Sequence, residues 1–225
     1  MPTTSTTRWR IALAGGALLT AIGGSMHPDS DAKDPLLDEI AVMTADSAWT
    51  PAHALIALGT IVMAVGLWQA VGSATWPARA QRALRLFAVG LSLYAVETVF
   101  HLAAVVDSDA LAAGDAAPVA WAHLGLAVVL YPLSGGALAW LGVQLHRTLS
   151  GPERILGAVA VVAGTLHATA YPTTLLLPDL ETTPMFAGAG MLMAAWGLAA
   201  GVTGLHSARS RSGSVAAPPR PALVA

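Results

Sequence analysis

Cysteine is absent from this chain, and charged side chains are scarce. The lack of cysteine among 225 residues excludes disulfides, thiolate metal sites, iron–sulfur clusters and cysteine nucleophiles. Charged residues make up 11% of the chain, whereas soluble domains carry about 25%. So few charges cannot cover a water-facing surface. Together with 55% hydrophobic residues and a mean hydropathy of +0.64, this composition indicates a membrane protein.

Known catalytic and nucleotide-binding motifs are also missing. The sequence has no Walker loop, no dinucleotide fingerprint, no G-x-S-x-G and no H-E-x-x-H. The few basic residues give no support to nucleic-acid binding. These absences leave open whether the protein is an enzyme, and they direct attention to its other polar residues.

Six apolar segments dominate the chain. They are Ile11–Ser25, Pro51–Val71, Leu84–Val106, Pro118–Leu145, Ile155–Leu177 and Pro184–Leu205. Spans of ~20 apolar residues cross a bilayer as helices, so we predict an all-α polytopic bundle of six transmembrane helices, arranged as three helical hairpins. The first segment is shorter, and a cleaved secretory signal peptide is the alternative for it.

The charges predict the orientation, because cytoplasmic loops carry an excess of basic residues. With both ends inside, the inner segments hold every arginine: Arg8, Arg10, Arg79, Arg82, Arg85, Arg147, Arg154, Arg209, Arg211 and Arg220. The outer loops then hold Lys33 as their one basic residue, together with most of the acids. We predict a transmembrane domain over residues 1–206 in the lipid bilayer of a bacterial inner membrane. Residues 207–225 are predicted to form a disordered cytoplasmic tail.

Histidines recur at matching places in the predicted hairpins. The first helix of each hairpin carries one near its outer end: His27, His101 and His167. The second helix of the first two hairpins opens with another, His53 and His123, in the segments Ala52-His53-Ala54-Leu55 and Ala122-His123-Leu124-Gly125. Four of these residues, called here the four outer histidines, should lie at about one depth in the membrane: His27, His53, His101 and His123. His167 should lie deeper. Trp49, Trp76 and Trp121 are predicted to anchor the chain at the membrane interface.

Glu97 is the one acidic residue deep inside a predicted span. A carboxylate there is costly and usually faces a partner or a water-filled cavity. His101, four residues on, lies on the same helix face, and Tyr94 extends that face by three residues in the other direction. We predict that Glu97, Tyr94 and His167 act around the histidines, either orienting a metal-bound imidazole or relaying protons, and a direct bond from Glu97 to the metal is a further alternative.

The four outer histidines are therefore the predicted ligands of a transition metal ion, Zn or Cu, or of a haem. Paired hairpins with histidines in the outer half resemble haem-bearing membrane proteins of the cytochrome b and haem A synthase type, although no motif matches. The resemblance implies bis-histidine ligation, by His27 with His101 or by His53 with His123. A small proton-coupled transporter and a structural subunit of a membrane complex are the two alternatives.

Overall fold

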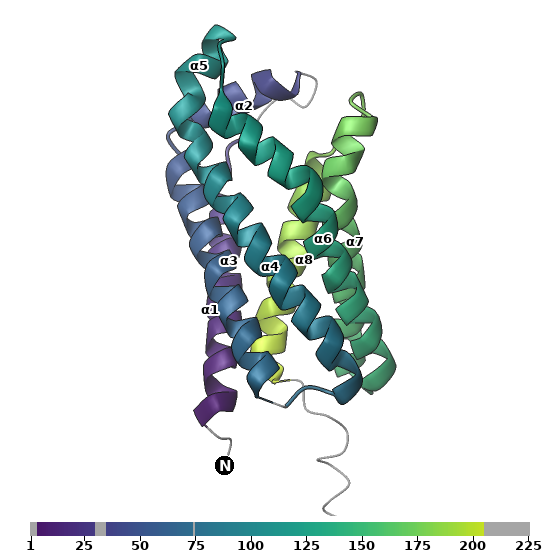
Figure 1. The fold of residues 1–225 in the computed structure, drawn as a ribbon. Helices are drawn as coiled ribbons and strands as arrows, with labels where there is room; N and C mark the ends of the chain where they lie inside the picture. The colour runs from purple at the N-terminus through teal and green to yellow at the C-terminus, as the bar shows by residue number, and fades with distance from the viewer. Residues whose placement is uncertain (1–3, 30–34, 74, 205–225) are drawn as a thin grey trace, which may run out of the picture.

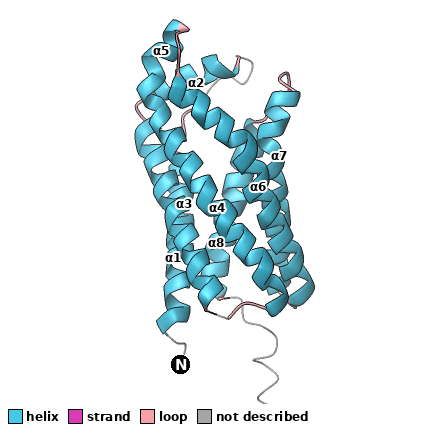
Figure 2. Cartoon of the chain, viewed as in Figure 1, coloured by secondary structure: helices cyan, strands magenta, loops and turns pink. Residues whose placement is uncertain are grey.

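The protein is an all-helical bundle. A computed structural model describes residues 4–29, 35–73 and 75–204, and this part of the chain contains no strand (Figure 2). The helices in chain order are α1 (Thr4–Ser25), α2 (Leu36–Ala45), α3 (Trp49–Gly72), η1 (Ala78–Ala80), α4 (Gln81–Ala103), η2 (Ala104–Asp107), α5 (Ser108–Ala113), α6 (Pro118–Thr148), α7 (Glu153–Leu176) and α8 (Thr183–Thr203). His206 and the predicted tail lie outside the described residues.

Six long helices form a closed ring. Each packs against the next in the order α1, α3, α4, α6, α7, α8, and α8 packs back against α1. The short helices α2 and α5 lie at one end, called here the upper end, and the N-terminus lies at the other (Figure 1). Consecutive long helices run in opposite directions, which agrees with three successive hairpins.

Five stretches of the described chain are long and apolar enough to cross a membrane, which supports the predicted membrane protein. They are α3, the run Ala78–Ala113 that contains α4, then α6, α7 and α8. Helix α1 is of similar length but begins at Thr4, seven residues before the predicted start. Its first turns therefore carry threonines, Arg8 and Arg10, and it does not reach the hydropathy of the other five.

Glycines hold two of the helix pairs very close together. In α1 and α3 they recur seven residues apart, at Gly16 and Gly23 and at Gly59 and Gly66. A Cβ added at Gly16 would lie 2.6 Å from the carbonyl oxygen of Gly59, so only glycine permits this approach. The same seven-residue spacing separates Gly135 from Gly142 in α6 and Gly157 from Gly164 in α7. The second close seam therefore joins the second and third hairpins.

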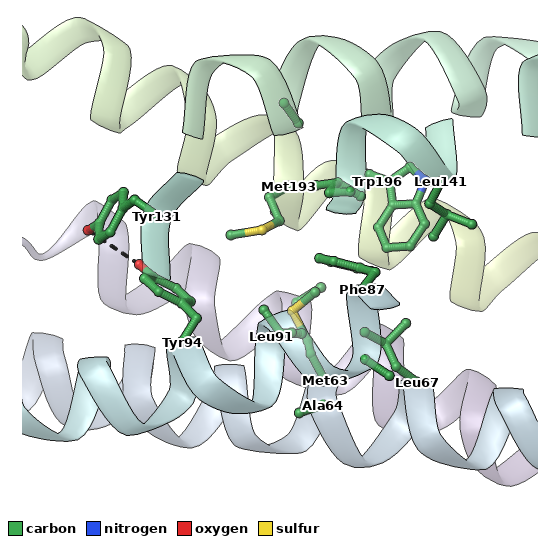
Figure 3. Packing of buried hydrophobic residues seen from close by; sticks show 14 of the residues in the cluster. Met63, Ala64, Leu67, Phe87, Leu91, Tyr94, Tyr131, Leu141, Met193 and Trp196 are labelled. Carbon is green, nitrogen blue, oxygen red and sulfur yellow. Dashed lines mark hydrogen bonds between the residues drawn. The ribbon is translucent and has the colours of Figure 1, made fainter. Parts of the chain in front are cut away.

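The lower half of the bundle is packed with apolar side chains. Phe87 of α4 meets Trp196 of α8 edge-on, with ring centroids 5.7 Å apart (Figure 3). Trp9 of α1 packs on Trp76 at the same separation, and both are buried. Trp76 is thus a core residue, and the prediction that it anchors at the interface is wrong.

Polar contacts fix both ends of the ring. At the lower end, the Arg10 guanidinium donates to the carbonyl oxygens of Gly201 and Val202 in the last turn of α8. At the upper end, the buried Asp107 carboxylate accepts the backbone N–H groups of Val119 and Ala120 at 2.6 and 2.9 Å. Asp107 therefore caps the N-terminus of α6 and fixes the helix that carries His123.

Candidate metal centre at the upper end

The four outer histidines come together at the upper end of the bundle, as predicted. His27 follows α1, His53 lies in the first turns of α3, His101 near the end of α4, and His123 in the first turns of α6. Ring centroids are 4.7 Å apart for His27 and His53, 4.4 Å for His53 and His101, and 4.1 Å for His101 and His123. Each of the first two hairpins supplies one pair, so the sequence repeat is visible in the site.

Two of these imidazoles are tethered through one nitrogen. His53 Nδ1 donates to the carbonyl oxygen of Trp49 at 2.8 Å, and His27 Nδ1 donates to that of Pro28 at 2.8 Å. A carbonyl accepts only, so each tether places the proton on Nδ1 and the lone pair on Nε2. His53 Nε2 is buried and has no hydrogen-bonding partner. Metal-binding histidines are commonly oriented in this way, through the nitrogen that does not bind the metal.

Trp49 belongs to the site, so the prediction of an interface anchor is wrong for this residue. Its side chain is fully buried, with its ring centroid 3.9 Å from that of His53 and 5.1 Å from that of His101. Its indole N–H donates to the carbonyl oxygen of Leu102 at 3.3 Å. The backbone carbonyl of Trp49 therefore orients the His53 ring, and the indole ring of Trp49 packs against the imidazoles of His53 and His101. Trp121, in contrast, is 58% exposed.

Glu97 is fully buried and faces His123 on the neighbouring helix α6. Its Oε1 lies 2.7 Å from His123 Nδ1. Among the described residues, the two carboxylate oxygens and this ring nitrogen have no other polar partner. The expected partner, His101, belongs to the same group, but the close contact is with His123. The contact with His123 is an ion pair when that imidazole is protonated, but the second carboxylate oxygen has no partner among the described residues. Burying a polar atom in this way is costly, which marks the position as one for a further ligand.

The donor atoms form two groups of metal-binding dimensions. One consists of His27, His53 and His101, and the other of Glu97, His101 and His123. Within each group the ligand atoms lie within 4.8 Å of one another. Metal–nitrogen bonds of about 2.0–2.1 Å bring tetrahedral ligands somewhat closer than this. Small side-chain rotations would close either group around an ion.

The packing of these rings favours an ion over a haem. A macrocycle held by His27 and His101 must lie between them, and the ring of His53 is within 4.7 Å of both. His101 stands in the same way between His53 and His123. In each predicted haem pairing a third imidazole fills the space that the porphyrin needs.

Tyr94 and His167 form a second polar cluster, apart from both groups of metal-binding dimensions. The Tyr94 hydroxyl is 3.4 Å from that of Tyr131 (Figure 3). The Tyr131 ring stacks on His167 at 4.4 Å. Ser134 Oγ donates to the Leu130 carbonyl at 2.6 Å and is 3.1 Å from His167 Nε2. His167 thus lies among residues of α4, α6 and α7, and its sequence position alone did not indicate these neighbours.

Comparison of the chain with protein-family models, curated proteins and solved structures gave no match. The site's own geometry must therefore carry the functional argument.

Proposed function

We propose that this protein is an integral membrane protein of six spans that binds a transition metal ion through His27, His53, His101, Glu97 and His123. The observation that carries the proposal is the pair of tethered imidazoles. His27 and His53 both fix their protons on Nδ1, which leaves the lone pair of each Nε2 free to bind metal, and the buried His53 Nε2 has no hydrogen-bonding partner among the described residues. An imidazole-rich site with one carboxylate suits Zn²⁺ or Cu²⁺. Metal handling and electron transfer are the two roles open to such a centre.

The proposed orientation places the metal centre on the extracytoplasmic side. The described arginines all belong to the lower end of the bundle: Arg8, Arg10, Arg79, Arg82, Arg85, Arg147 and Arg154. The described acids of the connecting segments belong to the upper end, except Glu153. The positive-inside rule then puts the lower end in the cytoplasm of a bacterial inner membrane. The packing of Gly16 against Gly59 supports α1 as the sixth span.

A proton-coupled transporter is the second candidate, and the Tyr94–Tyr131–His167 cluster favours it. Polar side chains continue from Glu97 toward the middle of the bundle through these three residues. Below them the apolar core around Phe87 and Trp196 interrupts the row. A complete relay would need a second conformation, whereas a metal centre needs only the arrangement described.

Metal analysis of the purified full-length protein tests the proposal. The detergent-solubilised protein, loaded with Zn²⁺ and desalted, should retain stoichiometric zinc. His53→Gln should retain less zinc than the wild type, while His146→Gln, which alters a histidine at the lower end, should retain as much as the wild type. Wild-type protein that retains no stoichiometric zinc or copper after reconstitution would contradict the proposal. A transporter or a structural subunit would then be the remaining candidates.

A further inference from the structure

We infer that the centre holds two metal ions, with His101 as the ligand they share. This inference rests on the proposed function and concerns the same site. His27, His53 and His101 would bind the outer ion, and Glu97, His101 and His123 the inner one. The five ligand residues form two overlapping groups of three, and His101 is the one member common to both.

The ring of His101 is placed to serve both groups. It lies 4.4 Å from the ring of His53 and stacks on that of His123 with centroids 4.1 Å apart. Because an imidazole binds metal in the plane of its ring, one of the two stacked rings must rotate before both bind the inner ion. An imidazole carries its two nitrogens at separate positions, and neither nitrogen of His101 forms a hydrogen bond to another described residue. When both bind metal, the ring gives up its remaining N–H proton to solvent. His101 then bridges the two ions as an imidazolate.

The inner position has its own reason to attract a cation. Glu97 is fully buried, both of its oxygens lack a hydrogen-bonding partner, and no lysine or arginine of the described chain forms an ion pair with it. A buried carboxylate is stable only when it is paired, neutralised or bound to metal. His123 is the nearest group, and its Nδ1 at 2.7 Å lies where a ligand beside the carboxylate would be needed. Adjacent ligands of a tetrahedral ion lie about 3.3 Å apart, so an ion would bind here once His123 moves slightly away from Glu97. The ion would then supply the positive charge that a protonated His123 supplies in the present contact.

The outer position is complete without Glu97. Its His27 and His53 imidazoles are tethered to backbone carbonyls, and its third ligand is His101. His27 is half-buried, so this position lies nearer the surface than the inner one. A variant that lacks an outer ligand should therefore lose the outer ion and keep the inner one. A variant that lacks an inner ligand should lose the inner ion and keep the outer one.

Zinc counting on single variants tests this inference. Full-length protein in detergent is saturated with Zn²⁺, desalted and analysed for zinc per chain, after size-exclusion chromatography has shown that each variant is monodisperse. Wild-type protein should hold two zinc ions. His27→Gln and Glu97→Gln should each hold one, the double variant none, and His167→Gln, outside both groups, should still hold two.

Copper loading gives a second readout. Two Cu²⁺ ions bridged by His101 should couple magnetically and show a weakened EPR signal, and His27→Gln should restore the signal of one isolated Cu²⁺. One zinc ion in the wild type, lost equally in His27→Gln and in Glu97→Gln, would overturn the two-ion centre and leave the proposed function standing. Wild-type protein that retains neither zinc nor copper would contradict both the two-ion centre and the proposed function.

Discussion

At the scale of single residues, Glu97 is the most destabilising side chain of the spans when it is charged and uncompensated, and it is also the residue that says most about the site. A charged group in the middle of a span is worth several kcal/mol of destabilisation unless something compensates it. The chain places it where His123 and His101 surround it. A residue retained for helix packing alone would be replaced by an apolar one without loss.

Glu97→Gln should therefore weaken metal binding at the inner position by more than the roughly 10–100-fold that follows from altering only a ligand's support. The side-chain volume is preserved while the charge is removed. Competition with a chromogenic chelator measures the affinity. Glu153→Gln, on the surface at the lower end, is the matched control. Unchanged affinity in Glu97→Gln together with raised thermal stability in Glu97→Leu would contradict a role in binding.

Trp49 offers an optical test of the same site. Its ring centroid is 3.9 Å from that of His53, so Cu²⁺ bound there should quench its fluorescence. Trp49→Phe keeps the backbone carbonyl that tethers His53 and should still bind copper, but the quenched component of the emission should disappear. Trp121→Phe, an exposed tryptophan, should leave that component in place. Equal quenching in wild type and Trp49→Phe would place the copper elsewhere.

At the scale of helices, the two glycine seams make α1 with α3, and α6 with α7, the closest pairs of the ring. Backbone atoms meet there without intervening side chains. Membrane helices gain little from the hydrophobic effect between them, so such close packing supplies much of their association energy.

Neighbouring glycines in α6 allow a controlled test of a seam. A Cβ at Gly135 would collide with the backbone nitrogen of Ala168, whereas one at Gly136 meets nothing within 4 Å. Gly135→Ala should destabilise the protein by about 1–3 kcal/mol through overpacking. Gly136→Ala should be neutral or slightly stabilising, because alanine favours the helix. The midpoints of thermal unfolding in mild detergent compare the two variants. Equal midpoints would show that α6 and α7 can move apart at Gly135 without loss of stability.

The sequence was sufficient for the five long apolar helices, because apolar runs of this length have few alternatives in a membrane. It did not predict the short helices α2 and α5. It also placed His27, His53, His101 and His123 at one level, since depth follows from residue counts along each helix. The partner of Glu97 could not be read in this way. Spacing along one helix identifies His101, but the contact with His123 depends on how α4 and α6 are rotated against each other. Trp49 was misplaced for the same reason.

At the scale of the whole molecule, the alternation of charges between the two ends predicts the topology. The chain has no native cysteine, so introduced ones report without background. Ala116→Cys, exposed at the upper end, should react with a membrane-impermeant maleimide on intact spheroplasts. Ser150→Cys, exposed at the lower end, should react only after permeabilisation. The opposite pattern would invert the proposed orientation.

The contact of α8 with α1 also has a consequence for how the protein is assembled. All five proposed metal ligands precede residue 124, whereas the ring closes only when α8 reaches α1 and Arg10 meets the last turn of α8. During synthesis the ligands are therefore in the membrane before the wall of the bundle is complete. A nascent chain that has inserted α6 could already take up metal from the extracytoplasmic side, and the final helix would then enclose a centre that was filled beforehand.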